Sequence, residues 1–125
     1  MRDEKPSTIE QRNNIRRKLL KKLVATASGI ISYEVGMPVG VWKLRRIIGW
    51  LKLEGIVLNF PVLGKYDTAT VAIPSGKERL NCSRNALRRY DAELNQINLR
   101  FHDHVIDVCF AIIDKYSDAD KFIDN

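Results

Sequence analysis

The chain has 125 residues, of which 45% are hydrophobic and 29% are charged, and its formal net charge is +6. This is the composition of a globular protein with a core, and the length predicts a single domain. No apolar run approaches the roughly 18 residues that cross a bilayer, and the N-terminus lacks the apolar stretch of a secretory signal. We therefore expect a cytoplasmic protein with no membrane partner, in which Cys82 and Cys109 are reduced thiols.

The excess positive charge is confined to the first half of the chain. Residues 1–60 contain 12 Lys and Arg against 5 Asp and Glu, whereas residues 61–125 contain 9 against 10. Such asymmetry is typical of a basic face that binds an anionic partner, most often nucleic acid. A solvated helix surface that keeps the protein soluble explains the same charge, and composition alone does not separate the two.

Residues 1–6 are expected to be a flexible tail, followed by a first helix that ends near Gly29. Ser7 and Glu10 match the spacing of a capping box at its start. Basic residues take most of the helix surface, and we assign Arg16 among them as a candidate contact to a nucleic-acid backbone. Apolar residues at a spacing of four predict the buried stripe, which consists of Ile15, Leu19 and Leu23.

Residues 30–38 fit either a strand or a short helix, and Gly36 and Pro38 then interrupt the chain. Residues 40–54 are predicted to form another helix, which ends at Gly55. Its apolar residues must face inward, so its outward arc is basic and aromatic, and we assign that arc as a candidate DNA-binding surface. Trp42 fits equally a wedge beneath the preceding helix. The assigned residues are Gly40, Val41, Trp42, Lys43, Arg45 and Arg46.

From Val57 to Ile73 the pattern becomes strand-like, with a glycine turn at "LGKYD". This pattern predicts a two-stranded β-hairpin. Lys65 and Tyr66 lie at its tip, where they suit contact with phosphate or the minor groove, although an exposed turn without a ligand has the same residues.

After Gly76 the chain contains no Gly or Pro, which predicts one long helix over residues 77–116 and an acidic tail over 117–125. Apolar side chains recur in it at heptad spacing, from Leu87 as far as Ala111. So long a helix must either pair with a second copy of the chain or break and fold back. The residues assigned to a dimer interface are Leu87, Tyr90, Leu94, Ile97, Phe101, His104, Val108 and Ile112.

This order of elements resembles the winged helix-turn-helix superfamily. The segment "MPVGVWKLRRIIGWLKLEGIV" is similar to the second half of that motif, with Val39 at the turn. The segment "VAIPSGKERL" is similar to the wing-to-helix junction of the phenolic-acid-repressor and multiple-antibiotic-resistance-regulator types, in which the next long helix helps to build the dimer. The resemblance covers roughly residues 9–80, and the chain departs from it at Gly36 and Pro38, where those families carry a plain turn.

The resemblance implies a mainly α fold with a small β-hairpin wing over residues 7–76, followed by a dimerisation helix. It implies a sequence-specific double-stranded DNA-binding protein, a dimeric transcriptional regulator whose helix 40–54 binds a pseudo-palindromic site. A winged-helix protein–protein interaction module of phage or plasmid type, and a DNA-binding replication or partition protein, are the alternatives. We expect no enzymatic activity, no cofactor and no metal site, and the sequence does not indicate whether a small-molecule effector exists.

Overall fold

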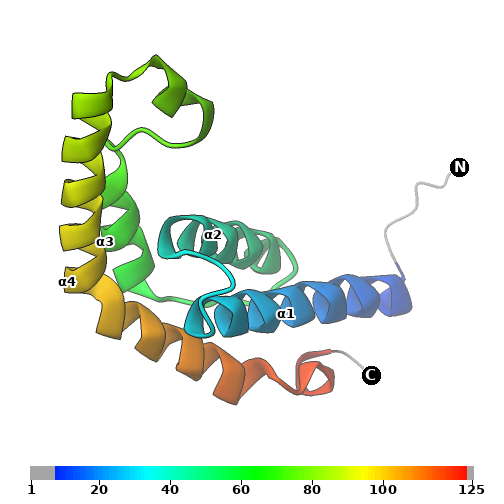
Figure 1. Cartoon of the computed structure of the whole chain (residues 1–125). Coiled ribbons are helices and arrows are strands. Elements are labelled where there is room, and N and C mark those ends of the chain that lie inside the picture. Colours follow the sequence, from blue (N-terminus) through cyan, green and yellow to red (C-terminus); the bar gives the residue numbers. More distant parts are fainter. Residues whose placement is uncertain (1–7, 124–125) are drawn as a thin grey trace, which may run out of the picture.

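The computed structural model describes residues 8–123, so the expected tail and the Ser7 cap lie outside the described residues. Its α-helices are α1 (Ile9–Ile31), α2 (Met37–Leu53), α3 (Pro61–Thr70) and α4 (Arg84–Tyr116), and two short 3₁₀ helices are η1 (Gly76–Asn81) and η2 (Ala119–Phe122). Figure 1 shows α1 and α2 side by side, while α4 runs past α3 and curves beneath α1. Residues 8–123 contain no β-strand, so the predicted wing is wrong and the fold is all-α.

The capping box of α1 lies one residue later in the chain than the sequence predicted, because it pairs Thr8 with Gln11. The Thr8 hydroxyl accepts a hydrogen bond from the Gln11 backbone N–H (3.1 Å), and the Gln11 side chain accepts one from the Thr8 N–H (2.9 Å). The buried stripe is also rotated from the predicted one, since Ile15 is 39% exposed. Side chains buried on α1 are Leu20, Leu23, Ala27 and Ile30.

Helix α2 starts at Met37, three residues before the predicted start, because Pro38 suits the first turn of a helix, where its missing N–H is not needed. Gly40 lies where α2 crosses α1. A Cβ atom at Gly40 would lie 2.4 Å from Ile30 Cγ1, so only a glycine permits this close approach. The crossing buries Gly40 and Val41, whereas Val39 in the first turn of α2 is 53% exposed.

The segment predicted as a hairpin instead forms an extended connection and helix α3. Pro61 stands in the first turn of α3, and Leu63 and Tyr66, three residues apart, face the core. The Tyr66 hydroxyl donates a hydrogen bond to Asn98 Oδ1 on α4 (2.6 Å), and burial raises the Tyr66 pKa to about 12. Packing against α4 therefore overrides the strand propensity of the β-branched residues in this segment.

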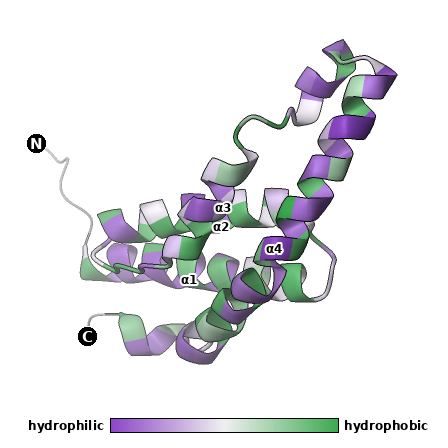
Figure 2. Cartoon of the chain, turned by 90° about the vertical axis from the view of Figure 1, so that its left-hand side faces the viewer, coloured by the Kyte–Doolittle hydropathy of each residue, from purple (hydrophilic) through white to green (hydrophobic). Residues whose placement is uncertain are grey.

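Helix α4 is shorter than predicted because the chain turns at Cys82, which is extended, and Ser83 caps a new helix by accepting from the Ala86 N–H (3.1 Å). At 33 residues α4 is about 50 Å long. Its C-terminal half packs on α1 and its N-terminal half on α3, and Figure 2 shows that its first turns stand away from the other α-helices.

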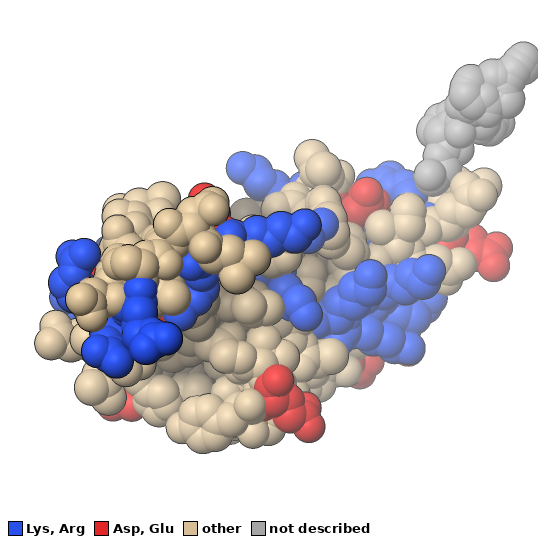
Figure 3. All heavy atoms as spheres, turned by 45° about the horizontal axis from the view of Figure 1, so that its top comes forward, with Lys and Arg blue, Asp and Glu red and all other residues tan. Residues whose placement is uncertain are grey.

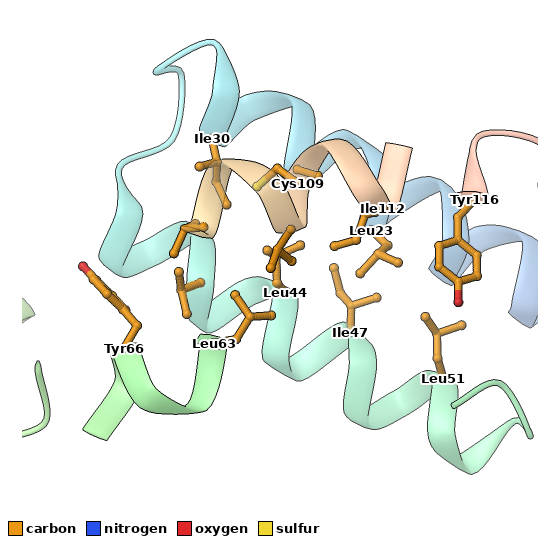
Figure 4. Close-up of a cluster of buried hydrophobic side chains, with 14 of the residues drawn as sticks. Leu23, Ile30, Leu44, Ile47, Leu51, Leu63, Tyr66, Cys109, Ile112 and Tyr116 are labelled. Carbon is orange, nitrogen blue, oxygen red and sulfur yellow. The ribbon is translucent and has the colours of Figure 1, made fainter. Parts of the chain in front are cut away.

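The core lies where α1, α2 and α4 meet, and Tyr66 and Leu63 extend it beneath α3. Figure 4 shows Leu23, Leu44 and Ile112 pointing toward one another from these three helices. Both cysteines are free thiols, and burial raises the Cys109 pKa to about 11. No helix within residues 8–123 has the length and apolar character required to span a membrane.

Candidate functional site

Helices α1 and α2 together carry ten Lys and Arg but one acidic residue, Glu10. Three of the ten cations bond to other groups of the chain, and the other seven are exposed. Figure 3 shows a cluster of Lys and Arg side chains on its right-hand side. The three internal contacts are Arg16 Nε to the Glu54 carbonyl (2.8 Å), Arg17 to Asp120 (3.1 Å) and Arg45 to Asp67 (2.6 Å).

A groove of about 320 Å³ runs between α1 and α2, and we call it the basic groove. Three exposed cations line it, and none of them forms an ion pair within the described part of the chain. No carboxylate lines it, so the mutual repulsion of these cations is not offset inside the groove. Its lining residues are Lys22, Ala25, Thr26, Lys43, Arg46, Ile47 and Trp50.

Arg46 lies between the two tryptophans of the chain, and we call these three residues the Trp–Arg–Trp stripe. The Arg46 guanidinium carbon is 4.6 Å from the Trp42 ring centroid and 4.8 Å from the Trp50 ring centroid. Both rings attract the cation through their π faces, which restricts the guanidinium to one position. Because Trp42 is 52% and Trp50 41% exposed, the stripe as a whole faces solvent.

The candidate residues at the N-terminal end of α2 are placed differently from those on its flank. Gly40 and Val41 are buried against α1, which removes them from any surface contact. The first turn of α2 contains no basic residue. Trp42 is not a wedge beneath the preceding helix, since half of it is exposed. The flank of α2, rather than its end, therefore carries the candidate site, through Trp42, Lys43 and Arg46.

Four other candidate residues have structural roles or lie elsewhere. Arg16 is buried and caps the C-terminal end of α2 through the Glu54 carbonyl. Tyr66 is buried in the core instead of standing at a wing tip. Lys65 is exposed on α3, outside the residues that line the basic groove, and Arg45 forms an ion pair with α3.

Half of the eight residues assigned to a dimer interface pack within the core of the chain itself. Ile97, Val108 and Ile112 are buried in the core, and His104 is exposed. Phe101 makes an edge-on contact with Tyr66 at 5.6 Å between ring centroids. Heptad spacing identifies an apolar face but not what covers it, and here α1 and α3 cover it. The remaining four, half-buried, are Leu87, Tyr90, Leu94 and Phe101.

Sequence reasoning missed Lys22 and Trp50 as members of the site. Lys22 joins it only because α1 packs antiparallel to α2, a relation that is absent from the local sequence. For Trp50 a signal did exist, since Trp42, Arg46 and Trp50 recur every four residues along one helix. That spacing places all three on one face.

A larger hollow of about 470 Å³ lies between α2, α3, η1 and α4, with Trp42, Asp67 and Glu78 in its wall. Its only charged lining residues are acidic, which separates it chemically from the basic groove. Among residues 8–123 no cluster of three or more His, Cys, Asp or Glu side chains is placed to hold a metal ion. The His102 ring instead contacts Asp103 (3.0 Å) and the Tyr33 hydroxyl (3.4 Å).

Comparison with protein-family models, curated proteins and solved structures gave no match for this chain. The resemblance to winged-helix proteins thus rests only on the residues that suggested it, and the all-α structure removes the wing from it. The chain's own geometry defines its class as an all-helical protein with a basic groove flanked by exposed tryptophans.

Proposed function

We propose that the chain is a DNA-binding protein, without enzymatic activity, that binds double-stranded DNA through the basic groove and the Trp–Arg–Trp stripe. One observation carries the proposal: Lys22, Lys43 and Arg46 converge from two helices on a groove that no carboxylate lines. A polyanion supplies the negative charge that would offset their mutual repulsion, and duplex DNA carries one negative charge per about 1.7 Å of its axis.

The three cations would bind phosphates in different ways. Lys22 and Lys43 act as point charges, whereas Arg46 presents a planar set of donors that matches two phosphate oxygens. The tryptophan rings hold Arg46 in place, so little side-chain freedom is lost on binding. Helix α2, of 17 residues, is about 25 Å long, which would allow its flank to follow several phosphates. In this mode the side of α2, not its N-terminal end, meets the duplex.

Two signals test the proposal. The chain has two tryptophans, both in the stripe, so DNA bound there should change their fluorescence. The anisotropy of a labelled duplex gives the affinity and its salt dependence. The three phosphate contacts of the basic groove should contribute about −2.7 to the slope of log K against log salt.

Single substitutions locate the contact. Lys43→Ala and Arg46→Ala should each reduce the magnitude of the salt slope by about 1, and weaken binding about eightfold at 0.1 M salt. Lys121→Ala, which removes the same charge from exposed η2, is the matched control and should have little effect. Equal losses in all three variants would refute binding at the groove. No duplex binding at low salt, together with a stable complex with another protein, would favour the interaction module instead.

We extend the proposal to a cytoplasmic transcriptional regulator that binds DNA as a homodimer. Selection of bound fragments from a random duplex library tests this extension. A motif with two related half-sites would support a dimeric regulator, and a single unrepeated motif would indicate binding as a monomer. Tight binding without any enriched motif would favour a replication or partition role over regulation.

A further inference from the structure

A second group of exposed cations lies at the tip of the molecule, on η1 and the first two turns of α4. We call residues 76–91 the arm, and Figures 1 and 2 show that it stands away from α1 and α2. Figure 3 shows its Lys and Arg side chains gathered on the same face as those near α1. Four of them are exposed and form no ion pair among the described residues: Lys77, Arg84, Arg88 and Arg89.

An ion pair of Arg79 joins the two parts of the arm, η1 and the start of α4. Arg79 donates two hydrogen bonds to the Asp91 carboxylate (2.8 and 3.2 Å), which joins η1 to the end of the second turn of α4. Those hydrogen bonds raise the Arg79 pKa and lower the Asp91 pKa. Ser75 and Glu78 form a capping box at the start of η1. The charge of Arg79 is therefore paired within the arm, whereas the four exposed cations of the arm point to solvent.

These exposed cations do not serve the stability of the helix that carries them. The first turn of α4 contains Arg84 and no acidic residue, although the positive end of a helix dipole favours acidic side chains. Leu80 is 84% exposed on η1. Residues three apart in a 3₁₀ helix share a face, so Lys77 and Leu80 are presented together.

We propose that the arm is a second DNA contact, in which Lys77, Arg84 and Arg88 bind phosphates of the duplex held by the basic groove and Leu80 enters the minor groove. This inference rests on the proposed function. An apolar side chain flanked by cations is the combination that wedges between base steps in minor-groove binding. Leu80 is the one large apolar residue exposed on the arm, whereas a membrane-binding surface presents an extended apolar face.

The test compares two double variants of equal net charge in the full-length chain. Arg84→Ala/Arg88→Ala removes two arm cations, and Lys115→Ala/Lys121→Ala removes two exposed cations from the other end of α4 and η2. On a 25-base-pair duplex the arm variant should lose about 2 from the salt slope, equivalent to binding about 60-fold weaker at 0.1 M salt. The control should bind as the wild type does.

The two tryptophans separate failure of the arm from failure of the groove. In the arm variant, saturating DNA should still change tryptophan fluorescence, because the stripe is intact. If the arm variant has the wild-type slope while DNA still changes that fluorescence, the arm inference is wrong and the proposed function stands. If the arm variant loses affinity but wild-type fluorescence never responds to DNA, the basic groove is not a DNA contact, whereas the arm is one.

Two further measurements complete the test. Leu80→Ala should reduce DNA bending, measured by energy transfer between dyes at the duplex ends, without changing the salt slope; unchanged bending would refute insertion of Leu80. Binding to phosphatidylserine vesicles but not to duplex DNA, lost in the arm variant, would overturn the nucleic-acid partner. Circular dichroism should show unchanged helix content in every variant, because the substituted side chains are exposed.

Discussion

Substitution of Gly40 by alanine tests the contact between α1 and α2 that forms the basic groove. An added Cβ atom would lie 2.4 Å from Ile30 Cγ1 and 2.6 Å from Cδ1, whereas carbon atoms in contact are about 3.5 to 4.0 Å apart. Ile30 is 2% exposed, so its side chain has no solvent to move into. The two helices must separate by roughly 1 Å, or Ile30 must leave its rotamer.

Two opposing effects set the change in the free energy of unfolding that Gly40→Ala causes. Overpacking of this kind costs about 1 to 3 kcal/mol, while alanine in place of glycine inside a helix stabilises by about 1 kcal/mol. Gly49, in the same helix, is the matched control, because a Cβ there meets no atom within 4 Å. Gly49→Ala should therefore stabilise the protein by up to about 1 kcal/mol. The difference between the two variants cancels helix propensity and measures the clash, about 1 to 3 kcal/mol.

Urea unfolding followed by circular dichroism measures both free energies of unfolding. Gly40→Ala should unfold at lower urea than Gly49→Ala, and Ile30→Ala should reduce the penalty of Gly40→Ala when the two are combined. If the two alanine variants were equally stable, α1 and α2 would not approach each other at Gly40. The basic groove would then lack the geometry on which the proposed DNA binding depends.

Three further changes test contacts between elements. Arg16→Ala should lower the free energy of unfolding in urea by about 1.5 to 3 kcal/mol, because a buried carbonyl loses a charged donor. Tyr66→Phe should cost about 1 kcal/mol through the lost bond to Asn98. Because folding raises the Tyr66 pKa from 10.0 to about 12, wild-type stability should fall as the pH rises through that interval, and Tyr66→Phe should remove this part of the fall. Asp91 has a lowered pKa, so the Arg79 pair should stabilise the arm above the ordinary Asp pKa and lose that effect as the pH falls below it; amide hydrogen exchange in the arm should show this loss, and Asp91→Asn should abolish it.

Local signals in the sequence predicted the three longest helices and little of what covers them. The breaks at Gly36 and Gly55 and the period of the apolar residues indicated α1 and α2, although α1 continues through the predicted stop at Gly29 to Ile31. The prediction of strands from Val57 is wrong where the chain forms α3. The helical form of α3 depends on burying Leu63 and Tyr66 against α4, which is distant in the sequence. Such long-range packing outweighs local propensity and is invisible in a short window of sequence.

The long C-terminal helix α4 also shows that local sequence does not reveal what packs against an element. Its period identified only part of the apolar face, since Val105, Cys109 and Tyr116 are also buried and His104 is exposed. A face covered by α1 and α3 also has the same spacing as one covered by a second chain. The break between η1 and α4 also escaped notice, since residues 77–116 contain no Gly or Pro. Ser83, which caps α4, was the available signal, because serine favours the residue just before a helix.

The candidate site moved from the end of α2 to its flank for a single physical reason. The glycine crossing buries Gly40 and Val41, and the first turn of the helix carries no cation. The accessible face of α2 carries Trp42, Arg46 and Trp50 at a spacing of four residues, with Arg46 between the two tryptophans. Helix α1 adds Lys22 to it. Side-on binding places these cations on phosphates and leaves few side chains near base edges. We therefore expect strong salt dependence with a short recognition motif, in which DNA shape contributes more to selectivity than base contacts.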